Sequence, residues 1–112
     1  MENQVKNITI EKLFNEDLEK YTIIDLRSSE EADKEKIGDA INLTFEAIWQ
    51  RLDEIPKEKP VVVYCATGDF SIEITEILSD RGYEAFNLTG GFREYKRYKL
   101  NKYNQIYNSE SR

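Results

Sequence analysis

The chain contains a single cysteine, Cys65, in the segment YCATGDFS at residues 64–71. This cysteine supports two interpretations. It is either a small apolar side chain buried at the end of a strand, as free cysteines commonly are, or a nucleophile held in a loop that stabilises its thiolate. The residues that follow it in the sequence bear on which interpretation applies.

The segment after Cys65 has the composition of an anion-binding loop. Gly68, which follows two small residues, lets the backbone curl so that successive N–H groups point at one spot. A helix expected to begin near Ser71 would direct its positive end toward the same spot. Such donors can stabilise a thiolate without a histidine base, and the sequence has no histidine. Ser71 is expected to cap that helix, to donate a hydrogen bond to the sulfur, or to do both.

Apolar segments rich in β-branched or aromatic residues predict the strands that position this loop. Three stronger segments lie at 21–26, 61–65 and 85–88, and two weaker ones at 7–10 and 40–43. The run of three valines at 61–63 indicates a strand that is buried on both faces, as in a parallel sheet covered by helices. Cys65 therefore stands at the end of a central strand.

Apolar residues at helical spacing lie between these strands. Helices are predicted near residues 13–18, over 45–55 and over 71–81, with Gly82 as the left-handed cap of the last. Strands that alternate with helices predict a small α/β domain with a mainly parallel sheet and right-handed crossovers. Ligands of such domains bind beyond the carboxyl ends of the strands, where Cys65 lies.

Length and composition predict one domain and restrict its environment. With 112 residues and 39% hydrophobic content, the chain can form one core, which we place at 1–100. Residues 101–112 are expected to form a loosely packed tail or a short helix. No stretch has the length of a signal peptide or of a membrane span, so we expect no membrane association and a cytoplasmic location that keeps the lone thiol reduced.

The charge distribution argues against a nucleic-acid partner. The formal net charge is −6, whereas a general nucleic-acid binder needs an excess of Lys and Arg. Residues 93–102 are an exception, with five basic residues and one acid for a local charge of +4. We favour a solvated helix face for this stretch. Nucleic-acid binding and cations beside a substrate entrance are its alternatives.

Four segments of the sequence resemble the rhodanese (sulfurtransferase) superfamily. They are IIDLRSSEE, EKIGDAINL, VVVYCATGDFS and NLTGGFREY, in this order between about residue 8 and residue 98. They are similar to the family's Asp-x-Arg, Gly-His-Ile-x-Gly-Ala-x-Asn, Tyr-Cys-x-x-Gly-x-Arg-Ser and Leu-x-Gly-Gly motifs. The resemblance implies a rhodanese-like three-layer domain, in which helices flank a small, mainly parallel central sheet.

The resemblance also implies a persulfide mechanism. The Cys65 thiolate would take a sulfane sulfur from a small donor or a protein persulfide and pass it to a thiol or to cyanide. The implied active-site loop comprises Ala66, Thr67, Gly68, Asp69, Phe70 and Ser71. Asp25 would accept hydrogen bonds from backbone donors near this loop, and Arg27 would pair with Glu30 or Glu31, in mainly structural roles. Neither a metal nor an organic cofactor is implied.

The loop departs from the family at Phe70, where an arginine is frequent. Without that cation, and with Asp69 nearby, we expect thiosulfate to be a poor physiological donor and a polysulfide or a neutral or protein-borne persulfide to be a better one. Phe70 either packs into the core, which we favour, or offers an apolar wall to a substrate or partner. Ser71 stands where related cysteine phosphatases have their arginine, which argues against phosphatase activity.

Two alternatives to a sulfurtransferase remain at this point. The first is a catalytically weak, rhodanese-like binding or regulatory module, because a fold alone does not establish chemistry. The second is a carrier that accepts sulfur without releasing it quickly.

Overall fold

The computed structural model describes residues 5–110, with side chains as far as residue 107. Its centre is a parallel sheet of five strands in the order β1-β5-β4-β2-β3. The strands are β1 (Asn7–Ile8), β2 (Thr22–Asp25), β3 (Ile41–Asn42), β4 (Val61–Tyr64) and β5 (Ala85–Leu88). All four residues of the central strand β4 are fully buried, as the run of valines predicts. All five predicted strands are present. Strand β5 has the predicted bounds, and the other four strands are shorter than predicted.

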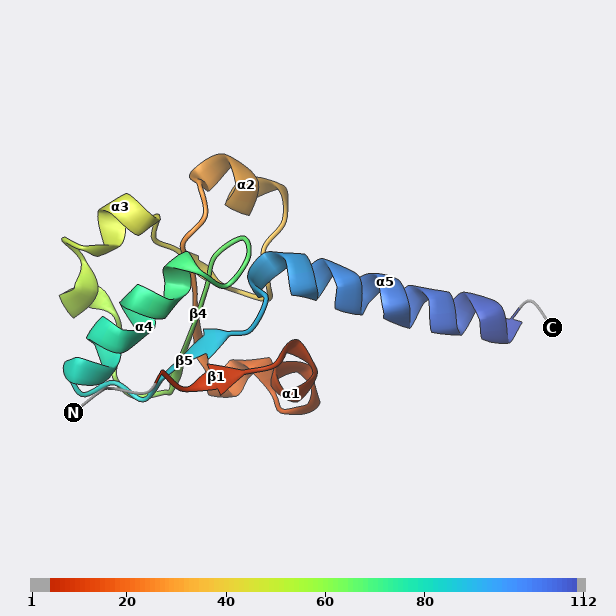
Figure 1. The fold of residues 1–112 in the computed structure, drawn as a ribbon, viewed down its shortest axis with the longest axis horizontal. Helices are drawn as coiled ribbons and strands as arrows, with labels where there is room; N and C mark the ends of the chain where they lie inside the picture. The colour runs from red at the N-terminus through yellow and green to blue at the C-terminus, as the bar shows by residue number, and fades with distance from the viewer. Residues whose placement is uncertain (1–4, 111–112) are drawn as a thin grey trace.

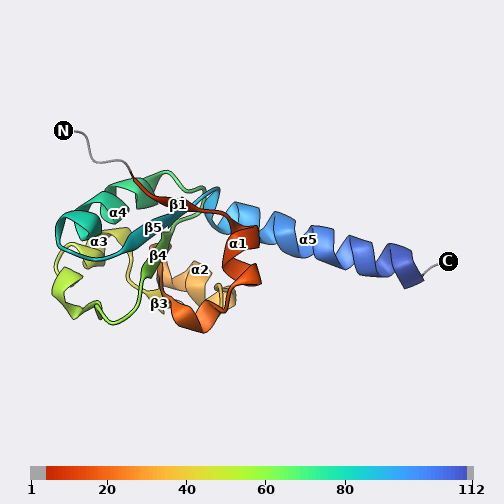
Figure 2. The same cartoon turned by 90° about the horizontal axis from the view of Figure 1, so that it is seen from below.

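Helices cover both faces of this sheet (Figures 1 and 2). The α-helices are α1 (Ile10–Asn15), α2 (Ser29–Lys34), α3 (Phe45–Ile48), α4 (Phe70–Asp80) and α5 (Gly91–Glu110), and the two 3-10 turns are η1 (Leu18–Lys20) and η2 (Leu52–Glu54). Successive side chains of a strand point to opposite faces. Accordingly, Val61 and Val63 pack with α3 and α4, whereas Val62 and Tyr64 pack with α1 and α5. The predicted three-layer α/β fold is confirmed.

The helices differ from the predictions in three places. The helix predicted near 13–18 is α1 at Ile10–Asn15, and Leu18 begins the separate turn η1. The single helix predicted over 45–55 is divided into α3 and η2, because Arg51 leaves the helical conformation and the Tyr83 hydroxyl donates to the carbonyls of Leu52 and Ile55. Helix α2 was not predicted, since only Ala32 of its six residues is buried and no apolar stripe marks it. Gly82 follows α4 with a φ of 93°, in agreement with its predicted role as a left-handed cap.

Helix α5 extends beyond the body of the domain (Figures 1 and 2). It is continuous across residue 100, so the stretch from 101 to 110 prolongs α5 and is not a separate short helix. The Tyr103, Ile106 and Tyr107 side chains are all exposed. Within the part of the chain that the structure describes, no helix has both the length and the hydropathy of a membrane span.

Candidate active site

Cys65 follows directly after β4, at the carboxyl edge of the sheet. Its side chain is only 4% exposed and belongs to the core cluster on the α4 side of the sheet. The loop that follows leads into α4 and lies beside the start of α5 (Figure 1). Burial alone would fit the interpretation of Cys65 as a small hydrophobe, but the polar contacts of its sulfur do not.

The sulfur of Cys65 lies among hydrogen-bond donors. The Gly68 N–H donates to Sγ at 3.2 Å, and the Ser71 hydroxyl oxygen lies 3.4 Å from Sγ. Burial raises the pKa of the thiol. The Ser71 side chain and the N–H groups of the loop outweigh burial, so the pKa lies below the ordinary value for cysteine. Neutral donors therefore favour the thiolate here, as the loop composition predicts.

The first turn of α5 holds the loop in place. The backbone N–H of Phe92 donates to the Cys65 carbonyl at 2.9 Å, and that of Arg93 donates to the Ala66 carbonyl at 3.0 Å. This contact requires glycine: a Cβ atom at Gly91 would lie 2.4 Å from the Cys65 carbonyl oxygen, and one at Gly68 would lie 2.9 Å from the Gly90 nitrogen. Both glycines also have positive φ. Backbone thus packs directly on backbone behind the cysteine.

The remaining side chains of the loop offer no cation. Thr67 donates to the Asp69 carboxylate at 3.1 Å, and Ala66 is exposed. Phe70 is 68% exposed, so the favoured prediction that it packs into the core is wrong. Its position explains this, because it is the first residue of α4 and points away from the buried stripe of Ser71 and Ile74.

Phe70 instead belongs to an aromatic cluster at the surface. Its ring centroid lies 5.7 Å from that of Phe45, which in turn lies 5.8 Å from the ring of Trp49. Trp49 is 41% exposed. We call Phe45, Trp49 and Phe70 the aromatic cluster; it connects α3 with the active-site loop.

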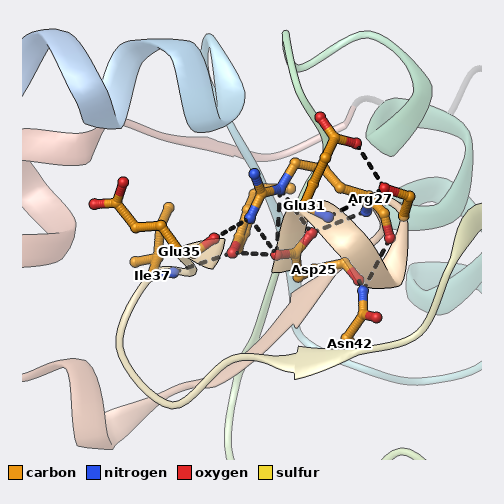
Figure 3. Close-up of polar contacts among 8 residues, drawn as sticks. Asp25, Arg27, Glu31, Glu35, Ile37 and Asn42 are labelled. Carbon is orange, nitrogen blue, oxygen red and sulfur yellow. Dashed lines mark hydrogen bonds and ion pairs between the residues drawn. The ribbon is translucent and has the colours of Figure 1, made fainter. Parts of the chain in front are cut away.

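Asp25 and Arg27 form a buried ion pair behind the site (Figure 3). The Arg27 guanidinium donates to the Asp25 carboxylate at 2.8 Å and to the Glu35 carbonyl at 2.5 Å. The prediction that Arg27 pairs with Glu30 or Glu31 is therefore wrong. Glu31 instead accepts a hydrogen bond from Ser28, the N-cap of α2.

Asp25 was expected to accept hydrogen bonds from backbone donors near the active-site loop, and its one backbone donor within residues 5–110 is Arg27, outside residues 66–71. Its carboxylate accepts from the Arg27 backbone N–H at 2.8 Å and from the Tyr64 hydroxyl at 2.6 Å. The Arg27 guanidinium also lies 3.7 Å from the ring centroid of Phe92 in α5. The pair thus links the ends of β2 and β4 to the first turn of α5, a structural role.

Sequence analysis missed Asn87. This residue of β5 is 3% exposed; it accepts a hydrogen bond from the Ser71 hydroxyl at 2.5 Å and donates to the Gly68 carbonyl at 3.2 Å. Asn87 could have been noticed as the lone amide in an otherwise apolar strand. A polar side chain that is buried in a strand requires hydrogen-bond partners. Asn87 faces α4, together with Ala85, and so completes the surroundings of the loop.

Acidic and sulfur side chains do not gather into a metal site. Over residues 5–110, no group of three or more His, Cys, Asp or Glu side chains is placed to hold a metal ion. The chemistry that the geometry supports is that of a single thiolate in a cradle of neutral donors.

Comparisons with known proteins agree with this geometry. The sequence model of the rhodanese-like domain family matches residues 10–98. A sulfurtransferase from Allochromatium vinosum is 35% identical over 85 residues, which is 75% of this chain and 79% of that protein. The thiosulfate sulfurtransferase GlpE from Coxiella burnetii is 33% identical over 75 residues, which is 66% of this chain and 70% of that protein. In one longer relative, the matching segment is only 14% of that protein.

A solved structure has the same fold. It is the crystal structure of a rhodanese-related protein from Thermoplasma volcanium, which is similar with a TM-score of 0.77. The similarity covers 82% of this chain and 91% of that chain, at 24% sequence identity.

Proposed function

Since the chain belongs to the rhodanese-like domain family, we propose that it is a sulfurtransferase that carries sulfane sulfur as a persulfide on Cys65. The observation that carries the proposal is the position of the Cys65 sulfur, which lies 3.2 Å from the Gly68 nitrogen and 3.4 Å from the Ser71 hydroxyl oxygen. These donors lower the pKa of a buried thiol and so supply the nucleophile. A reducing compartment such as the cytoplasm would keep this thiol free.

The proposed reaction has two displacement steps. In the first step, the Cys65 thiolate attacks the sulfane sulfur of the donor; a new S–S bond forms, and the donor's own S–S bond breaks to release its thiolate. In the second step, the acceptor thiolate attacks the outer sulfur of the Cys65 persulfide, and the Cys65 thiolate leaves. Sulfur moves with no external oxidant or reductant. The N–H groups of the loop stabilise the charge on Sγ as it is lost and regained.

The loop favours a polysulfide or a neutral or protein-borne persulfide as the donor. Residues 66–71 contain one acid and no base, so they offer no side chain that pairs with an anion such as thiosulfate. The exposed Phe70 gives the entrance an apolar wall in its place. One relative is named a thiosulfate sulfurtransferase, so thiosulfate and polysulfide should be compared directly.

Intact-mass spectrometry tests this function. The reduced protein is exposed briefly to polysulfide or, separately, to thiosulfate, with Cys65→Ser as the control. We expect polysulfide to add about 32 Da, the mass of one sulfur on a nucleophilic thiolate, and cyanide or a thiol to remove it. Cys65→Ser should stay unmodified, and its stability should change little, because serine is close to cysteine in size and its hydroxyl oxygen can accept from the Gly68 N–H as Sγ does. If neither donor adds sulfur to the wild-type protein, the proposed function is wrong.

A binding or regulatory module is the second candidate function. The aromatic cluster favours it, because exposed rings that gather beside a loop are typical of sites where proteins bind partners. The mass experiment distinguishes the two candidates. Sulfur that is taken up and released identifies an enzyme, whereas an unreactive Cys65 leaves the module as the remaining candidate. Sulfur that is taken up and released only slowly would identify a carrier.

A further inference from the structure

Asn87, Ser71, Cys65 and Gly68 form a closed ring of hydrogen bonds behind the active-site loop. The Cys65 Sγ contacts the Ser71 hydroxyl at 3.4 Å, and this hydroxyl donates to the Asn87 Oδ1 at 2.5 Å. The Asn87 Nδ2 donates to the Gly68 carbonyl at 3.2 Å, and the Gly68 N–H donates back to Sγ at 3.2 Å. Ser71, Asn87 and Cys65 are all buried. A group in this ring that loses its hydrogen-bond donor is therefore poorly placed to gain one from solvent.

The directions of the hydrogen bonds in this ring follow from Gly68. A carbonyl oxygen can only accept, so the group of Asn87 that faces it must be the NH₂ group. The Asn87 Oδ1 then faces Ser71 and needs a donor. The Ser71 hydroxyl has a single hydrogen, and this hydrogen points at Asn87. Toward Cys65, the hydroxyl consequently presents a lone pair, which suits a protonated thiol; the hydroxyl can stabilise a thiolate only after its hydrogen turns to Sγ.

We propose that Asn87 is a positioning residue that holds the Ser71 hydroxyl hydrogen away from Cys65, so that forming the thiolate requires this hydroxyl to rotate. When the hydroxyl turns to Sγ, the Asn87 Oδ1 loses its donor in a buried site. When Sγ takes up sulfur, the negative charge moves to the outer sulfur, and the hydroxyl can return to Asn87. Asn87 thus reduces the stabilisation that the Ser71 hydroxyl can give to the free thiolate, whereas the N–H groups of the loop still favour it.

The effect of Asn87 on catalysis rests on the proposed function. Its effect on the pKa of Cys65 does not. Charged side chains on the surrounding segments are not part of the ring. They are Asp69 in the loop, Glu46 on α3, Glu73 on α4, Arg93 and Glu94 on α5, and the Asp25–Arg27 pair. Within residues 5–110, none of them makes a hydrogen bond or ion pair with the sulfur.

A double-mutant cycle on the pKa of Cys65 tests the proposal. The pKa is read from the pH dependence of iodoacetamide alkylation, which requires no sulfur donor. Asn87→Leu frees the Ser71 hydroxyl, so we expect a lower pKa and a roughly tenfold larger thiolate fraction at pH values below the pKa. Ser71→Ala should raise the pKa. Asn87→Leu should then have no effect in the Ser71→Ala background, because its effect passes through Ser71.

The control is Asn7→Ala. Asn7 accepts the other hydrogen of the Asn87 amide, at 3.2 Å, but does not touch Ser71, so this variant should leave the pKa unchanged. The proposal is overturned if Asn87→Leu fails to lower the pKa, or if it lowers the pKa equally with and without Ser71. Because this readout is independent of sulfur transfer, a protein that fails the mass experiment can still pass this one.

Infrared spectroscopy of the wild-type protein gives a test that does not depend on the folding of a variant. The chain has one cysteine, so its S–H stretching band has a single source. At a pH where Cys65 is protonated, the thiol should donate to Ser71, and the band should lie below the frequency of a free thiol. It should move toward that frequency in Ser71→Ala. A wild-type band at the free-thiol frequency would contradict the direction of the hydrogen bond to Ser71.

Discussion

At the scale of residues, the site combines a buried thiol with donors that carry no formal charge. Cys65 is stabilised as a thiolate by loop N–H groups and by a hydroxyl, whereas the Asp25–Arg27 pair acts on the scaffold. A neutral cradle stabilises charge on the protein's own sulfur. It provides no attraction at long range for an anionic donor, because attraction over several ångströms requires a formal charge. If the proposed function holds, we expect donor preference to depend on exposed side chains beside the loop, such as Phe70.

Phe70→Arg tests the role of the entrance. An arginine at this exposed position adds the charge-assisted contact that the loop lacks, so we expect kcat/KM with thiosulfate to rise roughly tenfold, with less change for a neutral persulfide. Steady-state kinetics with both donors provide the measurement. Phe70→Ala separates loss of the ring from gain of the charge. Equal thiosulfate kinetics in the Arg and Ala variants would mean that position 70 does not contact the donor.

At the scale of elements, the active-site loop depends on the first turn of α5. Two backbone hydrogen bonds from this turn reach the carbonyls of Cys65 and Ala66, and the two segments pack without intervening side chains. Such close contact fixes the direction of the loop N–H groups. It also makes the donors around the sulfur sensitive to changes in α5.

Gly91→Ala tests this dependence, with Gly82→Ala as a matched control. Both glycines have positive φ, so each alanine should cost about 1 kcal/mol or more through backbone strain. At Gly82, the nearest atom to the new Cβ is the Lys57 Nζ at 4.0 Å, whereas at Gly91 the Cβ meets backbone at 2.4 Å. We therefore expect Gly91→Ala to lower the free energy of unfolding more than Gly82→Ala does, as measured by urea titration.

The same pair of variants separates stability from reactivity. Gly91→Ala should also slow the alkylation of Cys65, because its Cβ displaces the loop that donates to the sulfur. Gly82→Ala lies after α4 and should leave the alkylation rate unchanged. If both variants cost the same stability and neither changes the rate, the packing of α5 on the loop does not control the site.

At the scale of the whole molecule, ion pairs connect α5 to the segment between α2 and β3. Glu35, which follows α2, accepts a hydrogen bond from Lys96 at 2.7 Å and another from Lys99. Both lysines are more than 60 positions away from Glu35 in the sequence. Part of the basic stretch at 93–102 is thus neutralised within the molecule. This agrees with the favoured interpretation of the stretch as a helix face.

Glu35→Gln tests this connection through pH. The hydrogen bonds from Lys96 and Lys99 lower the pKa of Glu35 from the ordinary 4.5. A carboxylate whose pKa is lower in the folded state contributes stability above its unfolded pKa, and the contribution disappears as pH falls through the folded pKa. The wild-type protein should therefore be more stable than Glu35→Gln above about pH 5, with the difference vanishing in acid.

Urea titrations across this pH range provide the measurement, and Glu54→Gln is the control. Glu54 pairs with Arg51 only three residues away, on an exposed turn. Its loss should give a smaller difference, because the pair joins no distant segments. A Glu35→Gln variant as stable as the wild-type protein at pH 7 would show that the link to α5 adds nothing to stability.

Some features of this protein follow from local sequence. The valines of β4, the apolar stripe of α4 and Gly82 at its end predict an α/β domain, because burial and backbone conformation depend on neighbouring residues. The position of Cys65 at a strand end before a glycine-containing loop is equally visible. Helix α2 has no comparable stripe, and the stripe over 45–55 continues across Arg51, where the chain leaves the helical conformation, so these two regions could not be predicted well.

The sequence by itself therefore determined the class of fold, the place of Cys65 and the small-residue loop that follows it. Only the tertiary structure decided which side chains reach that loop: Asn87 meets Ser71, Arg27 turns to Asp25, and Phe70 stays at the surface. The physical reason is that these contacts depend on sheet register and helix packing. Both are set by the lowest free energy of the whole core, and no local pattern specifies them.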